Sequence, residues 1–326
     1  MTDDTRPRLP ITEDGGQRMF SAAADARTAR HMLSAIGDPK LGAPFWWDDC
    51  LYPWEKETAW LRQYLNAAIE HVEMYADIVV PRRYFEGMEV YIAPRPFFTL
   101  CRAAIESAAQ AVWVMYGELP AKRVERHVRL LHKDLDEHAK AARARGDKVE
   151  EAAALRRRDA IVERVGNLLT IDLSKDRLNY LDLVKPSAKL VERRAEDFEV
   201  LWRTSSAAAH GKGWFVDATH ETELGEEYEP GYFRATKTPR EDALLDIEET
   251  ACHFVLAAVF RYAEGIGYDA GSLIGPAFER TLRETTPKPG SEARREELIA
   301  SMRERVAEIN TQTAANRRST RDVADR

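Results

Sequence analysis

The stretch from Glu196 to Gly211 constrains the fold of this chain more than any other part of the sequence. Its polar and apolar residues recur at alternating steps of three and four, which is the spacing of the faces of an α-helix. Gly211 then supplies the residue type that ends helices in a left-handed conformation, and it places His210 in the last turn. An amphipathic helix must bury its apolar stripe, so other segments of the chain have to cover it.

Ser187 follows Pro186 and is a typical N-cap residue, so we predict a single helix over 187–210. One stripe of this helix is apolar and predicts packing. Its members are Val191, Ala195, Phe198, Trp202 and Ala209. The neighbouring stripe is polar and could carry chemistry. Its members are Glu196, Glu199, Arg203, Ser206 and His210.

The composition favours an all-α protein. Glycine and proline number only 17 and 15 in 326 residues, and long segments rich in alanine, arginine, glutamate and leucine favour helices over strands. We predict an up-and-down helical bundle with an N-terminal helical extension. The bundle helices are expected at 95–116, 119–145, 149–169, 187–210 and 241–264. The acidic run 221–231, between the apolar segments 214–216 and 232–235, is patterned as a short hairpin or a loop.

Three segments are expected along the chain. Residues 1–90 form an N-terminal arm and helical extension that includes an aromatic loop at 44–54. Residues 91–266 form the bundle. Residues 267–326 form a peripheral charged helix, starting at Glu292, and a polar tail.

Charge and cysteine usage limit the class of function. The net charge of −7 argues against broad, non-specific binding of nucleic acid, although a local basic site remains compatible with it. With no apolar run of 18 residues and no basic, apolar leader, we expect a cytoplasmic protein without a membrane partner. The three cysteines are scattered, and we expect free thiols, with Cys101 and Cys252 in the core. Asp134 and His138 lack further ligands at zinc spacing, so neither a metal nor a cofactor is expected.

Arg203 and His210 are separated by six residues, in the form Leu-Trp-Arg-x-x-Ser-x-x-x-His-Gly. This pattern resembles the Arg-x(4–6)-His motif of the HEPN superfamily, which includes metal-independent ribonucleases of toxin and phage-defence systems. It also looks like uncharacterised actinobacterial helical proteins. The resemblance implies RNA as substrate, a symmetric homodimer that completes the site, and an antitoxin or other defence partner.

The resemblance gives each candidate residue a role. His210 would exchange a proton with the ribose 2′-hydroxyl or the leaving oxygen, Arg203 would neutralise charge on the phosphate, and Ser206 would donate a hydrogen bond between them. Arg102 and Glu106 lie at i,i+4 within the mainly apolar segment 95–116. We expect them, with Glu199, to contribute binding groups, with a plain structural ion pair as the alternative for Arg102 and Glu106.

Two alternatives remain open at this point. The polar stripe could be the solvated face of an amphipathic helix, with Glu196, Glu199 and Arg203 paired at i,i+4 and i,i+7. The chain would then be a non-catalytic helical module for interaction or nucleotide binding, which keeps the bundle but not the chemistry.

Overall fold

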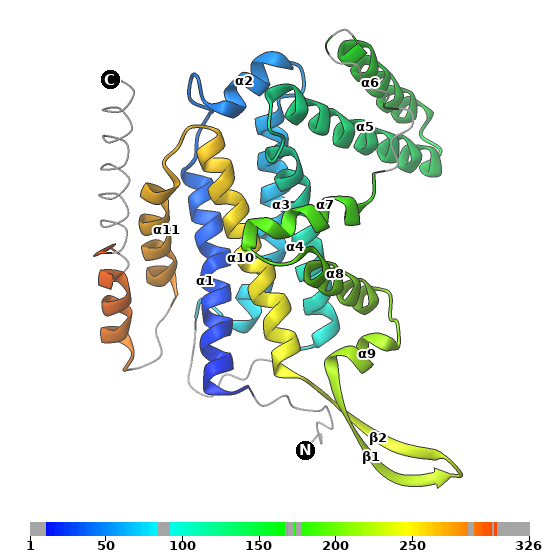
Figure 1. Ribbon diagram of the computed structural model, residues 1–326, viewed down its shortest axis with the longest axis vertical. Coiled ribbons are helices and arrows are strands. Elements are labelled where there is room, and N and C mark those ends of the chain that lie inside the picture. The colour runs from blue at the N-terminus through cyan, green and yellow to red at the C-terminus, as the bar shows by residue number, and fades with distance from the viewer. Residues whose placement is uncertain are drawn as a thin grey trace.

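The computed structural model describes residues 11–83, 92–166, 168, 173, 178–285, 290–301, 303 and 304. These residues are mostly helical, with one two-stranded antiparallel sheet, in agreement with the expected all-α class and its short hairpin (Figure 1). The elements are α1 (Glu13–Ala35), α2 (Pro44–Leu51), α3 (Glu57–Val79), α4 (Pro94–Met115), α5 (Pro120–Arg145), α6 (Lys148–Gly166), α7 (Tyr180–Ser187), the 3₁₀ helix η2 (Ala188–Val191), α8 (Ala195–Ala209), α9 (Trp214–Thr219), β1 (His220–Glu229), β2 (Tyr232–Pro239), α10 (Glu241–Gly265) and α11 (Ala270–Glu284). Residues 292–301 are helical as well.

Four long helices, α1, α3, α4 and α10, pack against one another and form the body of the molecule (Figure 1). Helix α11 lies against α1. Two of the four, α1 and α3, come from the segment 1–90 that was expected to be an extension, whereas α5 and α6 were expected in the bundle and lie outside it. The expected membership of the bundle is therefore wrong, because helical periodicity shows that a face is apolar but not which helix covers it.

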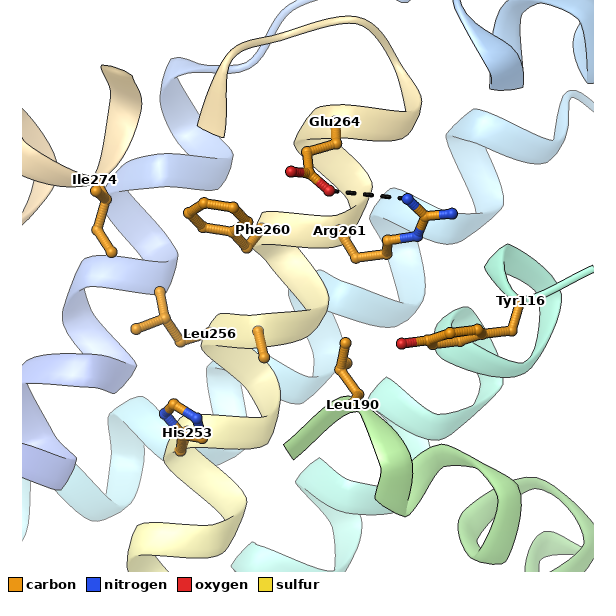
Figure 2. A pocket seen from close by; sticks show the side chains of 9 residues that line it. Tyr116, Leu190, His253, Leu256, Phe260, Arg261, Glu264 and Ile274 are labelled. Atoms are coloured by element: carbon orange, nitrogen blue, oxygen red, sulfur yellow. Dashed lines mark ion pairs between the residues drawn. The ribbon is translucent and has the colours of Figure 1, made fainter. Parts of the chain in front are cut away.

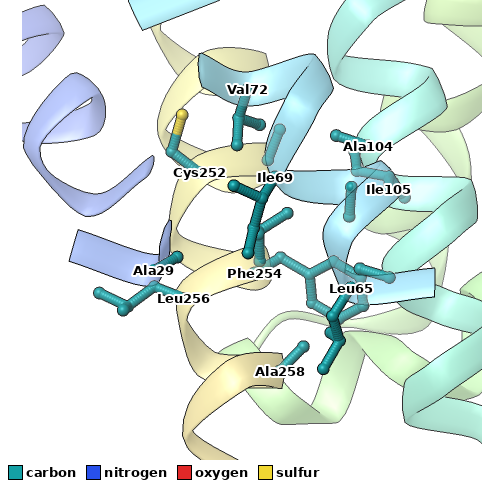
Figure 3. Close-up of a cluster of buried hydrophobic side chains, with 14 of the residues drawn as sticks. Ala29, Leu65, Ile69, Val72, Ala104, Ile105, Cys252, Phe254, Leu256 and Ala258 are labelled. Atoms are coloured by element: carbon teal, nitrogen blue, oxygen red, sulfur yellow. The ribbon is translucent and has the colours of Figure 1, made fainter. Parts of the chain in front are cut away.

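Small side chains let these helices approach closely. Figure 3 shows Ala29 of α1 and Ala104 of α4 in the same cluster as Ile69 of α3 and Phe254 of α10. Phe254 is fully buried and meets Phe198 of α8 edge to face, with 5.2 Å between ring centroids. This aromatic pair connects α8 to the body, so the packing of the core also sets the position of α8.

A carboxyl group lies buried inside this body. The Tyr75 hydroxyl of α3 donates to Oε2 of Glu248 on α10 at 2.6 Å, while Oε1 has no hydrogen-bond partner among the described residues. Burial raises the pKa of Glu248 to about 8. The neutral form of the carboxyl is therefore favoured near pH 7, which lowers the cost of burying it. Cys101 and Cys252 are free and fully buried, as expected.

Helices α5 and α6 pair with each other and form an arm with a smaller core of their own (Figure 1). The arm is joined to α2 by a buried ion pair in which Arg123 donates to both carboxylate oxygens of Asp48, at 2.6 and 2.9 Å. Glu57 is buried beside this pair, and burial followed by the charge of Asp48 raises its pKa well above the usual range. These polar contacts add to apolar ones between arm and body, since Leu130 of α5 belongs to the main core and Tyr52 at the end of α2 belongs to the core of the arm.

Helix α8 is shorter than predicted. Ser187 is the last residue of α7, and its hydroxyl donates to the carbonyl of Leu183 at 2.6 Å, so it does not cap a helix over 187–210. Glu192 adopts a left-handed conformation, with φ 53°, and this interrupts the chain between η2 and α8. Local periodicity continued across the break, but the backbone changes direction there.

Three further differences concern short elements. The segment 44–54, predicted as an aromatic loop, begins with α2, for which Pro44 stands at the first turn. The segment 214–216, predicted to flank the hairpin, belongs to α9, and the acidic run itself forms β1. Helix α11 was not predicted. Short helices such as α2 and α9 depend on tertiary contacts more than on their own propensity, which explains why the first two expectations failed.

Candidate functional site

Helix α8 ends as the sequence predicted. Gly211 has a φ of 66°, the backbone N–H of Lys212 donates to the Ala207 carbonyl at 2.9 Å, and that of Gly211 donates to the Ala208 carbonyl at 3.3 Å. These two bonds form a Schellman cap, with His210 as the C-cap residue. The imidazole of His210 therefore stands at the exposed C-terminal end of the helix.

Arg95 of α4 holds this end in place. Its guanidinium donates to the carbonyls of Ala208 and Lys212, at 3.3 and 3.2 Å, and lies 4.7 Å from the ring centroid of Phe215. Carbonyls at a helix C-terminus carry partial negative charge and attract cations. The role of Arg95 could not be predicted from the sequence, since only the fold brings the start of α4 to the end of α8.

Arg203 points along the helix toward its N-terminus. Its guanidinium contacts Oε1 of Glu199 at 2.7 and 2.8 Å, and Oε2 of Glu199 also accepts from Lys185 of α7 at 2.6 Å. Hydrogen bonds from Lys185 and Arg203 lower the pKa of Glu199. The i,i+4 pair is the arrangement expected of a solvated helix face, and it directs Arg203 away from His210.

Arg102 and Glu106 meet α8 on its other side. Arg102 Nε donates to Glu106 Oε1 at 2.9 Å, and the indole N–H of Trp202 donates to the same oxygen at 2.8 Å. The Arg102 guanidinium also lies 5.4 Å from the centroid of the Trp202 ring. Both members of the ion pair are mostly buried, so this contact positions α8 against α4. They touch the predicted packing stripe and not the polar stripe.

The buried face of α8 is rotated relative to the prediction. Phe198, Leu201 and Ser205 are buried, Trp202 is half-buried, and Ala209 is exposed. Ser206 is half-buried, and its carbonyl accepts the backbone N–H of His210 at 3.1 Å. The rotation follows from the position of α4, because Glu106 of α4 accepts a hydrogen bond from the Trp202 indole.

Arg95 brings one positive charge to the C-terminal end of α8. Its guanidinium donates to the Lys212 carbonyl there, and burial, followed by the charges of Arg95 and Lys237, lowers the pKa of His220. His220 is the first residue of β1 and contacts the Phe215 ring, with 6.0 Å between centroids. Lys237 is paired with Asp217, so its charge is locally offset.

A separate groove lies along the outer side of α10 (Figure 2). It has a volume of about 580 Å³ and is lined by α10 together with the ends of other elements, and its lining residues are Tyr116, Leu190, His253, Leu256, Ala257, Phe260, Arg261, Glu264 and Ile274. In Figure 2 the Tyr116 hydroxyl points into it and Arg261 pairs with Glu264 at its rim. None of the six predicted site residues lines this groove.

Among the residues that the structure describes, no group of three or more His, Cys, Asp or Glu side chains is arranged to hold a metal ion. His138 instead pairs with Glu150, at 2.8 Å. Nor does any helix in this part of the chain combine the length and apolar composition that crossing a bilayer requires.

Comparisons with known protein-family models, with curated proteins and with solved structures return no match. The HEPN resemblance consequently stays a prediction, carried by Arg203, Ser206 and His210.

Proposed function

We propose that the chain is a metal-independent endoribonuclease of HEPN type, and that the exposed polar face of α8 is its active surface. The observation that carries this proposal is the exposure of Arg203 and His210 on a helix that is fixed from behind. Trp202 holds the middle of α8 through Glu106, and Arg95 holds its end. Neither Arg203 nor His210 is used for packing, so both are available to a ligand.

The proposed chemistry needs a base, an acid and a cation. The imidazole of His210 accepts the proton of a ribose 2′-hydroxyl, whose oxygen attacks the adjacent phosphorus. The bond from phosphorus to the 5′-oxygen breaks, that oxygen takes a proton from a water molecule, the imidazolium of His210 releases its proton to solvent, and a 2′,3′-cyclic phosphate remains. Arg203 stabilises the negative charge that develops on the phosphate, and Ser206 donates a hydrogen bond to it.

A second copy of the chain is part of this proposal. Seven residues of helix separate the Cα atoms of Arg203 and His210 by roughly 10 Å, and Arg203 is turned toward Glu199. Two α8 helices packed antiparallel about a twofold axis would bring the His210 of one chain beside the Arg203 of the other. RNA would then replace Glu199 as the partner of Arg203.

The test is cleavage of a labelled single-stranded RNA by the purified protein in EDTA. We expect products that end in a 2′,3′-cyclic phosphate and no cleavage of the same oligonucleotide with 2′-deoxyribose. His210→Ala and Arg203→Ala should each reduce the rate by at least about a hundredfold. Arg194→Ala is the matched control, because Arg194 is an exposed arginine bound to Asp197 at the start of the same helix.

Activity that survives His210→Ala would overturn the proposal. So would a wild-type protein that cleaves neither single-stranded nor structured RNA.

A non-catalytic interaction module is the second candidate, and one observation favours it. Arg203, Glu199 and Lys185 already neutralise one another as a continuous network on the surface of α8 and α7. An RNA-inert protein with an intact fold would support this function instead.

A further inference from the structure

The β1–β2 hairpin leaves the body of the molecule beyond α9 and extends away from it (Figure 1). Every residue from 221 to 237 is exposed. The strands pair antiparallel, for example Glu223 with Thr236 and Leu224 with Ala235, and the turn between them contains Gly231 at a φ of 79°. A two-stranded hairpin without a packed face is only marginally stable by itself. Packing therefore does not explain why this chain forms such a long projecting hairpin, and a binding function would.

The base of the hairpin is firmly attached. The backbone N–H of Arg240 donates to the Thr219 carbonyl at 2.9 Å, and Lys237 pairs with Asp217 of α9 at 3.0 Å. Helix α9 is in turn anchored by Phe215, which is fully buried and meets Phe98 of α4 at 5.1 Å between ring centroids. The hairpin is thus presented in a defined direction, although its own surface is solvated.

The hairpin carries excess negative charge. Residues 220–239 contain five glutamates against two cations, Arg234 and Lys237, a net charge of −3, and Lys237 is already paired with Asp217. The Glu227 carboxylate accepts the backbone N–H of Gly231 in the turn. The other four form no ion pair with any residue that the structure describes, and they are Glu221, Glu223, Glu226 and Glu229.

Two of these glutamates are close enough to repel each other. Glu221 and Glu223 lie on the same face of β1, two residues apart, and their cross-strand partners are the neutral Thr238 and Thr236. Like charges at this spacing repel, and nothing on the neighbouring strand offsets them. They therefore weaken the hairpin, which is understandable if a cationic partner compensates them.

Large apolar side chains accompany the charges. Leu224, Tyr228 and Tyr232 are 64%, 57% and 61% exposed, and Phe233 is 44% exposed. The rings of Tyr228 and Tyr232 lie 6.4 Å apart at the tip. Aromatic side chains at an exposed tip are the type of residue that is enriched at the centres of protein interfaces.

We propose that the outer edge of β1 binds a lysine- or arginine-rich extended segment of a partner protein as a third strand. Within the described residues the sheet contains only β1 and β2, so the edge of β1 opposite β2 is unpaired. A strand added there places alternate side chains directly across from Glu221 and Glu223, while the intervening side chains meet the face of Leu224. The partner segment should thus alternate basic and apolar residues.

The charge of the edge selects against other occupants. A nucleic acid would bring phosphates against uncompensated carboxylates, and a second copy of this chain would bring the same glutamates against one another. Binding at this edge is independent of the ribonuclease proposed above, which uses the opposite sign of charge at α8.

The test uses a fluorescein-labelled short peptide that alternates lysine and valine, titrated with the full chain and followed by anisotropy. We expect saturable binding that weakens about tenfold or more in the double variant Glu221→Lys/Glu223→Lys. The control double variant, Glu137→Lys/Asp159→Lys, changes the net charge equally on the exposed surface of α5 and α6 and should bind as the wild type does. Circular dichroism should show the same helix content in all three proteins.

A second probe separates strand addition from simple charge attraction. The same peptide with alternate backbone nitrogens methylated keeps its charge but cannot form the ladder of hydrogen bonds, and it should lose most of its binding. Equal binding of the methylated peptide, or equal weakening by the control variant, would overturn the proposal. A dimer that forms in the wild type and dissociates in Glu221→Lys/Glu223→Lys would assign the edge to a second copy and also overturn it.

Discussion

Polar side chains have different surroundings in two regions of the molecule. One region is the body around α10, and the other is the surface formed by α8 with the β1–β2 hairpin. Inside the body, the Glu248 carboxyl is buried and bonded to Tyr75, and its neutral form is favoured. On the surface, Arg203, His210 and the hairpin glutamates are exposed and contribute nothing to the core. Polar groups of the first kind set stability, whereas those of the second kind are free to serve binding or chemistry.

The contact between Glu106 and Trp202 lies at the boundary of the two regions. It is polar and mostly buried, and it connects a bundle helix to the helix that carries the candidate site. Substitutions on the body side of this contact should therefore mainly lower stability, whereas substitutions on the exposed side of α8 should mainly lower activity.

The largest loss of stability is expected from Phe254→Ala. The ring is fully buried and pairs with Phe198, so its removal leaves a cavity and loosens α8 together with α10. We expect the free energy of unfolding to fall by about 3–5 kcal/mol, measured by chemical denaturation. A loss below about 1 kcal/mol would mean that α8 is not part of the same cooperative unit.

A pH-dependent effect of similar size is expected from Glu248. Its pKa is raised to about 8 in the folded chain, against about 4.3 for an unperturbed glutamate. The contribution of this carboxyl to stability is therefore fully present below about pH 4 and is lost as the pH rises through about 8. Denaturation series across this window should show the decline.

Glu248→Gln should flatten that decline by about 5 kcal/mol, because an amide does not ionise and can still accept from Tyr75. Glu57, whose pKa is raised in the same direction, should leave a residual slope. The exposed Glu137→Gln is the control and should keep the wild-type slope. An unchanged slope in Glu248→Gln would show that the carboxyl is not neutral in the folded chain.

Trp202→Phe should have an intermediate effect at the boundary. The ring remains aromatic, but Glu106 loses the indole donor and keeps only Arg102. We expect a loss of about 1–2 kcal/mol in the free energy of unfolding. The RNA-cleavage rate should fall with it if α8 has to be held at this angle, and an unchanged rate would separate the contact from the site.

The smallest effect on stability is expected from Arg203→Ala and His210→Ala. Both side chains are exposed, so the melting temperature should shift by no more than about 2 °C by differential scanning fluorimetry. These same variants should show the largest loss of RNA cleavage. A pronounced drop in melting temperature would place them among the structural residues and contradict the division between the two regions.

The candidate site could be predicted from the sequence only in part. The exposure of His210 at a helix end followed from Gly211, and the Glu199–Arg203 pair followed from their spacing. That Glu106 would bond Trp202 did not follow, since it joins residues 96 positions apart. The contacts of Lys185 and Arg95 with α8 could not be predicted either, because each residue reaches α8 from another helix.

The sequence by itself determined the helical class, the long helices and the glycine-capped end of α8, because capping and i,i+4 periodicity depend on residues within one or two turns. Only the tertiary structure decided that α1 and α3 pack with α4 and α10 in the main core, whereas α5 and α6 pack chiefly against each other. It also decided where α8 begins and which way its buried face turns. Several apolar faces in this chain are alike in pattern, and the choice among them depends on packing between distant segments, which no local pattern records.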